Sequence, residues 1–164
     1  MPKRSAGLLL YRQPVSEPLE LLLVHPGGPF WAKRDLGAWS IPKGEYLPPE
    51  DPLAAACREF QEETGAPAPE AARAEPLGDA VQAAGKVVTA FAVPGDLDVA
   101  AIRSNTFRME WPPRSGQWRD VPEIDRGGWF QPDEARRRII PGQAVFVDRL
   151  LDLVRAAALS PSSG

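Results

Sequence analysis

The sequence predicts an α/β fold in which helices cover a mixed central sheet. Short apolar runs separated by Gly and Pro breaks are typical of strands. Other segments carry apolar residues at the spacing of an amphipathic helix. Strands and helices follow one another in an irregular order, which disfavours a repeating βαβ fold. The pattern therefore favours an α/β sandwich with a mixed sheet.

The strands are expected as follows, in chain order. Residues 6–11 and 19–25 are apolar runs on either side of a polar, Pro-containing break, which suits two strands joined by a turn. A Pro-Gly-Gly-Pro break precedes a short extended segment at 38–42. The remaining strand candidates are 76–82, 86–93, 106–111 and 128–130.

Three helices are expected. The first begins after Asp51, a good N-cap, with Pro52 at the first helical position, and ends at Gly65, where a C-cap glycine belongs. The other two helix candidates are 133–139 and 143–158.

The length of 164 residues suffices for one domain, which we place at 1–159, and is too short to expect two. Residues 112–125 are interpreted as a polar loop that contains Trp118. Residues 160–164 offer nothing to pack, so we expect a disordered tail.

Composition excludes several classes of protein. Apolar residues make up 43% and charged residues 25%, as in soluble globular proteins, and no apolar run approaches the ~18 residues of a membrane span. The net charge of −3 disfavours long nucleic acid as a partner, although a bound divalent metal could still attract a small phosphorylated ligand. The single cysteine is consistent with a reducing compartment. We expect a cytoplasmic protein, either a monomer or a homodimer.

An acidic cluster lies on the first predicted helix. Glu59, Glu62 and Glu63 are spaced i, i+3 and i+4, so their carboxylates share an arc of roughly 100°. Like charges at this spacing repel, and a divalent cation such as Mg²⁺ or Mn²⁺, which prefers oxygen ligands, would compensate. The alternative is a solvated acidic face, which is common on exposed helices.

The cluster belongs to a longer pattern. Residues 44–66 match G-x5-E-x7-R-E-U-x-E-E-x-G-U, with U apolar, at every specified position. A chance match has a probability on the order of one in 10⁹ per register. The segment resembles the signature of the Nudix hydrolases, the MutT-like pyrophosphohydrolases. The resemblance extends over roughly residues 5–157, but only 44–66 is highly specific.

The resemblance implies the Nudix α/β/α sandwich with a mixed central sheet. It also implies that Glu59, Glu62 and Glu63 bind the metal, Mg²⁺ or Mn²⁺, with the carbonyl of Gly44 as a further ligand. The reaction implied is attack of water on one phosphorus of a diphosphate linkage, with the metal neutralising charge and activating the water.

The catalytic residues implied by the resemblance include Arg58 and Glu59. Arg58 and Glu50 occupy positions that usually brace the loop and the helix, and we group Glu50 as a supporting residue. The general base is open among Glu59, Glu110 and Glu123, because a base must reach the attacking water within about 3 Å, which the sequence does not show. Glu123 is the first choice downstream of the signature.

The substrate-binding candidates are Lys43 and Trp118. Lys43 precedes the signature and could contact a phosphate as a point charge. Trp31, Trp111 and Trp118 lie in or beside predicted loops, where each could stack on a base or simply pack. His25, the single histidine, is open to a general-acid role, but a structural role is favoured.

The sequence thus predicts metal-dependent hydrolysis of a phosphoanhydride bond in a nucleoside diphosphate linked to another group. Dinucleoside polyphosphates, nucleoside triphosphates including oxidised forms, nucleotide sugars and capped RNA all remain open as substrates. The alternative is a non-catalytic module of the same family that senses a nucleotide or binds a partner.

Overall fold

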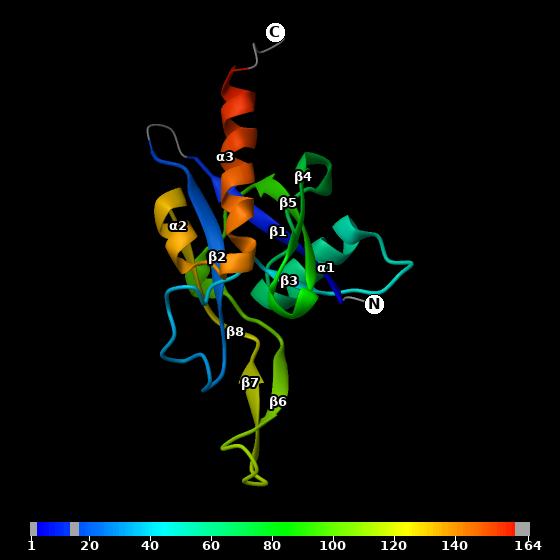
Figure 1. The fold of residues 1–164 in the computed structure, drawn as a ribbon, viewed down its shortest axis with the longest axis vertical. Coiled ribbons are helices and arrows are strands. Elements are labelled where there is room, and N and C mark those ends of the chain that lie inside the picture. Colours follow the sequence, from blue (N-terminus) through cyan, green and yellow to red (C-terminus); the bar gives the residue numbers. More distant parts are fainter. Residues whose placement is uncertain (1–2, 14–16, 160–164) are drawn as a thin grey trace.

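The computed structural model describes residues 3–13 and 17–159. A central sheet lies among the helices, and a two-stranded hairpin projects from one end of the molecule (Figure 1). Within the described residues the strands and helices are β1 (Arg4–Arg12), β2 (Glu20–Pro26), β3 (Lys43–Glu45), α1 (Pro52–Thr64), β4 (Glu75–Val81), β5 (Val87–Pro94), β6 (Thr106–Glu110), β7 (Trp118–Pro122), β8 (Ile124–Phe130), α2 (Pro132–Arg138) and α3 (Ala144–Leu159). Short 3-10 turns lie at Ala71–Arg73, Ala83–Gly85, Val99–Ala101 and Pro141–Gln143.

The main sheet has the order β4-β5-β1-β2-β8, with β3 also paired to β1. β1 and β5 run parallel, and every other pair in this sheet is antiparallel. The prediction of a mixed central sheet is therefore confirmed. β6 and β7 pair only with each other and form the projecting hairpin.

One edge of β1 is shared by two strands. The end of β1 near Arg12 pairs with β2, whereas the end near Ser5 pairs with β3. β2 and β3 separate between these points, and only an isolated bridge between Val24 and Ser40 links the two chain segments. This divergence opens the sheet at the place where the candidate site lies.

Alternation along β1 sends its side chains into two hydrophobic layers. Leu8 and Leu10 join Phe60 of α1 in one buried cluster. Leu9 joins Phe146 of α3 in another, on the opposite face of the sheet. Helices thus cover both faces, and the predicted α/β/α sandwich is confirmed.

The first helix forms as its end signals predict. The Asp51 side chain accepts a hydrogen bond from the amide of Ala54 at 3.1 Å, and Pro52 starts the helix. Gly65 takes the left-handed conformation with φ of 76° and donates its amide to Gln61. Glycine adopts this conformation without the steric cost that a Cβ would add, so the helix ends there.

The prediction of a loop at 112–125 is wrong for part of that range. Trp118–Pro122 forms β7, which pairs with β6, and β8 already begins at Ile124 instead of residue 128. Most of β7 is exposed, so its sequence shows no apolar alternation, and pairing with a distant segment determines its structure. The short extended segment expected at 38–42 forms isolated bridges at Trp39 and Ser40, and β3 starts at Lys43.

The helices and the C-terminal residues bear on two further expectations, the absence of a membrane span and a disordered tail. Among the described residues, no helix has the length and apolar character needed to cross a membrane. The predicted tail at 160–164 lies outside the described residues.

Candidate functional site

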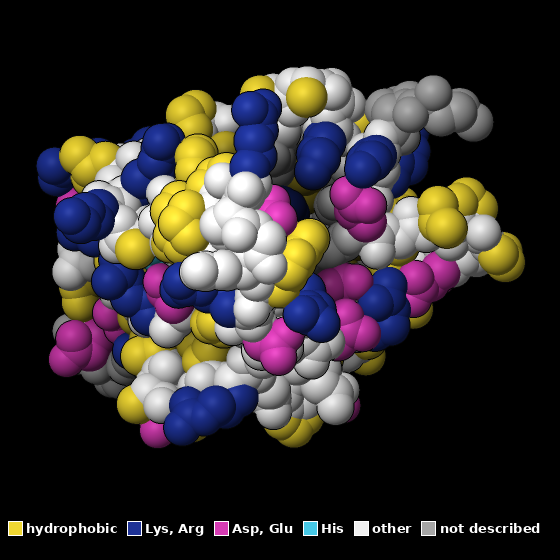
Figure 2. Space-filling view, turned by 90° about the horizontal axis from the view of Figure 1, so that it is seen from below, with side chains coloured by type: hydrophobic (Ala, Val, Ile, Leu, Met, Phe, Trp, Pro, Cys, Tyr) yellow, Lys and Arg dark blue, Asp and Glu magenta, His cyan; other side chains and the backbone are white. Residues whose placement is uncertain are grey.

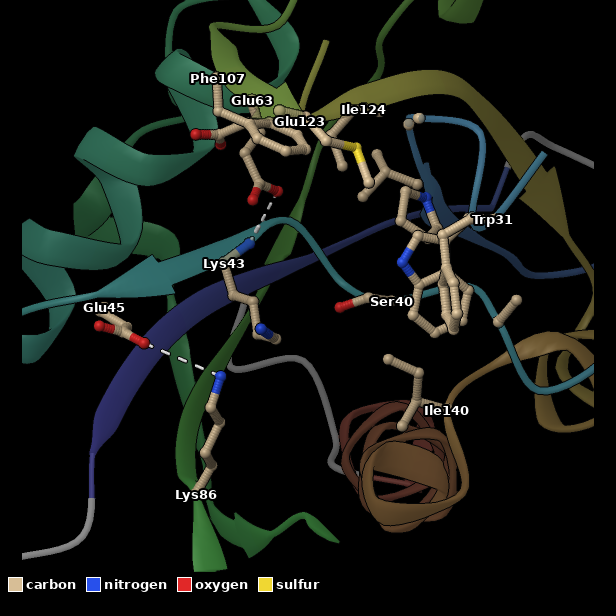
Figure 3. Close-up of a pocket in the computed structure, with 17 residues that line it drawn as sticks. Trp31, Ser40, Lys43, Glu45, Glu63, Lys86, Phe107, Glu123, Ile124 and Ile140 are labelled. Carbon is tan, nitrogen blue, oxygen red and sulfur yellow. Dashed lines mark hydrogen bonds and ion pairs between the residues drawn. The ribbon is translucent and has the colours of Figure 1, made fainter. Parts of the chain in front are cut away.

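A cleft of about 810 Å³ opens where β2 and β3 diverge. Residues from β2 and the loop after it, from β3, α1 and the hairpin, and Lys86 just before β5 line it (Figure 3). Its lining residues are Val24, Pro26, Gly27, Gly28, Phe30, Trp31, Ala38, Ser40, Lys43, Glu45, Glu63, Lys86, Phe107, Met109, Glu123, Ile124 and Ile140.

The three signature glutamates of α1 differ in exposure, and two of them, Glu59 and Glu63, contact β3. Glu59 and Glu63 are buried, with 8% and 9% of their surface exposed, whereas Glu62 is half-buried. The carboxylate of Glu63 accepts a hydrogen bond from the backbone amide of Lys43 at 3.1 Å. This bond ties α1 to β3 and fixes Glu63 at the cleft wall.

Gly44 makes room for the Glu59 carboxylate. A Cβ atom added to Gly44 would lie 2.0 Å from Cδ of Glu59, closer than any real contact. The carboxylate therefore lies against the β3 backbone at a position where only glycine fits. The predicted metal-binding pair of Glu59 and Gly44 is thus brought together in space.

Arg58 braces this arrangement from the outer side of α1. Its guanidinium donates two bonds to Glu50, at 2.9 and 3.0 Å, in the forked geometry that favours arginine and carboxylate. It also donates to Glu59 at 2.8 Å and lies 3.4 Å from an oxygen of Glu62. Hydrogen bonding to Arg58 lowers the pKa of Glu50, and hydrogen bonding to Glu50 raises the pKa of Arg58.

The buried carboxylates are electrostatically costly. Burial raises the pKa of Glu63 to about 8, although its bond from the Lys43 amide and the Lys43 charge oppose the rise. Burial also raises the pKa of Glu59 and of Glu123, and the negative charge of Glu62 adds to both shifts. Carboxylates that disfavour each other's ionised forms in this way are a suitable environment for a divalent cation.

The donor set fits a hard divalent cation by its chemistry. Glu59, Glu62, Glu63 and the Gly44 carbonyl all offer oxygen, which Mg²⁺ and Mn²⁺ prefer. Among the described residues, no three acidic, cysteine or histidine side chains converge closely enough to hold an ion as they stand. The carboxylates of Glu59 and Glu62 both bond to Arg58 instead.

The candidate general bases lie in different surroundings. Glu123, between β7 and β8, lines the cleft on the same side as Glu63 (Figure 3). Glu110 lies at the outer end of β6, where its carboxylate accepts the backbone amides of Arg114 and Gly116 in the hairpin turn. Glu110 thus stabilises the turn, and the structure does not place it among the residues that line the cleft.

The two predicted substrate-binding residues are separated. Lys43 points into the cleft (Figure 3), but Trp118 lies at the outer end of β7, 56% exposed and outside the set of lining residues. Trp31 does line the cleft, next to Phe30. Sequence reasoning did not distinguish Trp31 from the other loop tryptophans, because only the folded chain shows which of them faces the cleft.

Lys86 is a cleft residue that the sequence did not reveal. It follows the 3-10 turn at Ala83–Gly85 and precedes β5. It lies 43 positions from Lys43 in the sequence and belongs to no motif. Pairing of β1 with both β3 and β5 brings the two lysines to one cleft, and no local pattern signals this.

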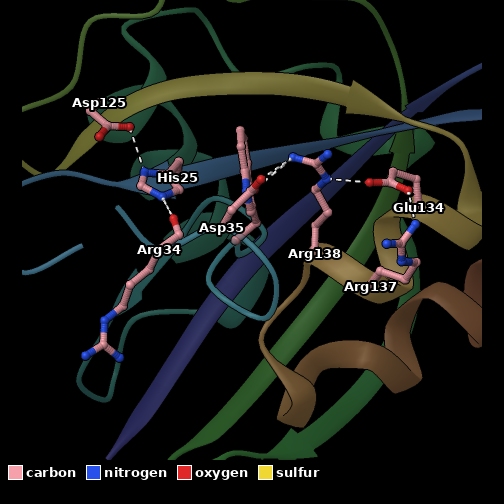
Figure 4. A network of polar contacts seen from close by, with 8 residues as sticks. His25, Arg34, Asp35, Asp125, Glu134, Arg137 and Arg138 are labelled. Atoms are coloured by element: carbon pink, nitrogen blue, oxygen red, sulfur yellow. Dashed lines mark hydrogen bonds and ion pairs between the residues drawn. The ribbon is translucent and has the colours of Figure 1, made fainter. Parts of the chain in front are cut away.

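His25 holds the loop that carries Trp31, as a structural residue would. Its ring is fully buried, with Nδ1 2.9 Å from Asp125 and Nε2 2.6 Å from the carbonyl oxygen of Arg34 (Figure 4). Each ring nitrogen thus lies within hydrogen-bond distance of an oxygen atom. Asp35, next in the loop, accepts two bonds from Arg138 at 2.8 and 3.0 Å. The loop is thus fastened to β8 and to α2.

The end of the molecule near the hairpin carries mixed charge. Figure 2 views this end, where Lys and Arg side chains are interspersed with Asp, Glu and apolar side chains. Among the side chains coloured there, no continuous basic surface of the kind that tracks a nucleic-acid backbone is visible.

A family model described as NUDIX domain matches residues 1–150. No curated protein sequence is similar enough to this chain to count as a match. Among solved structures, the Ap4A hydrolase of C. elegans in a binary complex has a TM-score of 0.63 at 19% identity, covering 93% of this chain and 98% of that chain.

Two further structures are similar. The NUDIX domain of Shewanella oneidensis NrtR, complexed with ADP ribose, has a TM-score of 0.61 at 14% identity and covers 94% of this chain and 89% of that chain. The MutT protein from Methanosarcina mazei Go1 has a TM-score of 0.58 at 19% identity, covering 94% and 96%. At these identities the likeness establishes the fold.

Proposed function

Since the chain belongs to the Nudix family, we propose that it hydrolyses a phosphoanhydride bond in a nucleoside diphosphate linked to another group. The reaction is proposed to depend on Mg²⁺ or Mn²⁺. A dinucleoside polyphosphate or a nucleoside triphosphate, oxidised forms included, is the substrate class that we favour.

One observation carries this proposal. The carboxylates of Glu59, Glu62, Glu63 and Glu123 influence one another, Glu63 and Glu123 line the cleft, and burial together with mutual repulsion raises the pKa of Glu59, Glu63 and Glu123. A solvated acidic face would leave its carboxylates exposed, with ordinary pKa values. The burial of Glu59 and Glu63 therefore favours a ligand-binding role over that alternative.

We assign the metal to Glu59, Glu62, Glu63 and the Gly44 carbonyl. A divalent metal bound there would neutralise phosphate oxygens and lower the pKa of the attacking water. Arg58 keeps Glu59 and Glu62 near one another through its bonds to both, and Glu50 holds Arg58 in position. Arg58 thus acts through the carboxylates that it orients.

Glu123 is the proposed general base. Its carboxylate lies in the cleft wall, and burial raises its pKa, which makes the ionised form a stronger base. Glu59 is the weaker candidate, because it is already bonded to Arg58 and packed on Gly44. Glu123 would take the proton of the attacking water, while the leaving phosphate departs on the opposite side of the phosphorus.

The substrate contacts that we propose are Lys43 for a phosphate and Trp31 for the base. Lys43 has its ammonium in the cleft, and Trp31 offers a flat aromatic surface in the opposite wall. Trp118, the tryptophan that the sequence favoured, is replaced in this role because it lies outside the lining. The similar structures named for Ap4A hydrolysis and for bound ADP ribose support a substrate with linked phosphates.

A panel of nucleotides with product analysis tests the function. The panel holds dinucleoside polyphosphates, nucleoside triphosphates and nucleotide sugars, each assayed with Mg²⁺, with Mn²⁺ and with chelator. Glu62→Gln removes one proposed ligand without a volume change, so turnover should fall by about 10² or more. The matched control is Glu70→Gln. Glu70 is exposed and its side chain makes no capping hydrogen bond, so this variant should retain full turnover.

The same panel separates the competing hypotheses. Metal-dependent turnover that Glu62→Gln abolishes supports the hydrolase. Nucleotide binding with no turnover of any substrate would favour the non-catalytic module. Equal turnover by wild type and Glu62→Gln would contradict the assignment of the metal site.

A further inference from the structure

The proposed base lies outside the strands that flank it. Glu123 is the single residue between β7, which ends at Pro122, and β8, which begins at Ile124. Its main chain is nevertheless bonded on both sides. The amide of Glu123 donates to the carbonyl oxygen of Asn105 at 2.9 Å or less, namely 2.8 Å, and its own carbonyl oxygen accepts the amide of Gly27 at 2.9 Å. Two distant segments therefore hold the backbone that carries this carboxylate.

Asn105 is bonded in turn to the signature helix. Its amide donates to the carbonyl oxygen of Glu62 at 2.9 Å. One residue and two hydrogen bonds thus join the main chain of Glu62, a proposed metal ligand, to the main chain of Glu123. Two residues earlier, the amide of Arg103 donates to the carbonyl oxygen of Thr64 at 2.9 Å. The last carbonyl groups of a helix lack partners within the helix, and these two amides supply partners at the end of α1.

Glycines allow this close packing. A Cβ added to Gly65, the C-cap of α1, would lie 2.7 Å from the carbonyl oxygen of Arg103. A Cβ added to Gly27 would overlap the carbonyl oxygen of Pro122. The end of α1, the residues 103–105, which we call the connector, and the turn between β7 and β8 therefore pack tightly against one another.

Ser104, in the middle of the connector, contributes its side chain to this packing. Its hydroxyl donates to the carbonyl oxygen of Ile124 at 3.2 Å and accepts the amide of the same residue at 3.0 Å. Ile124 is buried, and its register partner in β2 is Pro26, which has no N–H to donate. Ser104 thus supplies a donor that β2 lacks there, next to Glu123.

The carboxylate of Glu123 depends on this backbone for its position. Within the described ranges 3–13 and 17–159, its side chain makes no hydrogen bond or ion pair, although it lines the cleft (Figure 3). Displacement of a catalytic group by about 1 Å can cost about 100-fold in rate. A contact that fixes the neighbouring peptide groups therefore bears directly on where the base lies.

We propose that Ser104 is a positioning residue, which fixes the base Glu123 relative to the metal-binding helix α1. This inference rests on the proposed function, which assigns Glu123 as the base. Ser104 is not among the residues that line the cleft, so it acts through the backbone of Ile124. Its loss should displace the base and leave the proposed substrate contacts, which come from other segments, in place.

Steady-state kinetics on the best nucleotide of the panel test this role. Ser104→Ala should lower kcat about tenfold and change KM less than about twofold, because the base is displaced by less than about 1 Å. Ser104→Thr keeps the hydroxyl and should restore most of kcat. The matched control is Ser115→Ala, since Ser115 is exposed, lies outside the cleft lining and accepts the amide of Gln117 in the hairpin turn. This control should leave kcat and KM unchanged.

A double-mutant cycle shows whether the effect passes through Glu123. In the Glu123→Gln background, Ser104→Ala should lower kcat less than about twofold, because no base remains to be displaced. A loss of the same size in both backgrounds, or no loss in the wild-type background, would overturn the positioning role.

Amide hydrogen exchange, followed by NMR, tests the contact without turnover. Ser104→Ala should reduce the protection of the Ile124 amide about tenfold, while amides inside α1, such as that of Ala56, keep their protection and show that the variant folds. Unchanged exchange at Ile124 would overturn the inference. If the wild type hydrolyses no nucleotide but exchange at Ile124 still depends on Ser104, the proposed function fails and the contact between the connector and β8 stands. Robust hydrolysis with no effect of Ser104→Ala on kcat refutes the positioning role alone.

Discussion

Apart from Glu123, the carboxylate side of the cleft comes from one short stretch of chain, whereas the opposite sides are assembled from distant segments. Gly44, Glu59, Glu62 and Glu63 all lie within 44–66, on β3 and α1. The other sides draw on the loop after β2, Lys86 just before β5, the hairpin and the turn before α3.

The two kinds of side are also stabilised differently. On the carboxylate side, Arg58 of the signature bonds to Glu59 and Glu62, and the amide of Lys43, the residue just before the signature, bonds to Glu63. The loop with Trp31 depends instead on bonds to β8 and α2 through His25 and Asp35. A family can therefore keep its chemistry in a local signature and change its substrate through distant segments.

Glu123 comes from a distant segment but lies on the carboxylate side of the cleft. Its substitution should have the largest effect on turnover. Glu123→Gln removes the proposed base with little change in volume, and a general base contributes about 10²- to 10⁴-fold. We expect kcat to fall by that factor at saturating Mg²⁺. Glu110→Gln is the control, since its carboxylate bonds to the hairpin turn. A loss in Glu110→Gln that equals the loss in Glu123→Gln would contradict the assignment.

The pH dependence of turnover tests the same assignment of Glu123 as the base. Burial raises the pKa of Glu123, so the group is protonated, and inactive as a base, below a pKa that lies above the ordinary glutamate value. Turnover at saturating Mg²⁺ should therefore rise with pH through this raised pKa. In Glu123→Gln the acidic limb due to this group should vanish. An unchanged limb would point to Glu59 as the base.

Gly44→Ala should have the next largest effect on turnover, and it disturbs only the carboxylate side of the cleft. The added methyl would meet the Glu59 carboxylate, so either β3 or that side chain must move. Displacing a catalytic group by about 1 Å can cost about 100-fold, and we expect kcat to fall by that factor. Gly116→Ala, in the hairpin turn, meets no atom within 4 Å but has a left-handed φ of 74°, so it controls for a strained glycine substitution that does not touch Glu59. Full activity in Gly44→Ala would refute the tight packing of Glu59 on β3.

Much of the carboxylate side was predictable because the residues that determine its structure lie close together in the sequence. Helix α1 has its N-cap, first-turn proline and C-cap glycine within the element, and the i, i+3, i+4 spacing of the glutamates follows from helix geometry. Membership of the Nudix family and the α/β/α sandwich followed from the same signature, and both are confirmed.

The other sides of the cleft were not predicted, because the residues that determine their structure lie far apart in the sequence. Strand β7 is recognisable only by its pairing with β6, since its exposed residues carry no alternating pattern. Lys86 becomes a cleft residue only because β5 lies beside β1. Trp31 and Trp118 both resembled loop tryptophans, and the choice between them depended on which loop folds over the cleft.

Substitution of the two tryptophans therefore tests the sides of the cleft that come from distant segments. The expected change, in KM, is the smallest of those predicted. Stacking of a base on an aromatic ring contributes about 1–3 kcal/mol, so Trp31→Ala should raise KM about tenfold with little change in kcat. Trp118→Ala, a truncation of equal size at the exposed end of β7, should change KM less than about twofold. Steady-state kinetics on the best nucleotide of the panel measure both, and circular dichroism checks that both variants fold. A larger KM effect from Trp118 than from Trp31 would mean that the substrate extends along the hairpin, beyond the cleft.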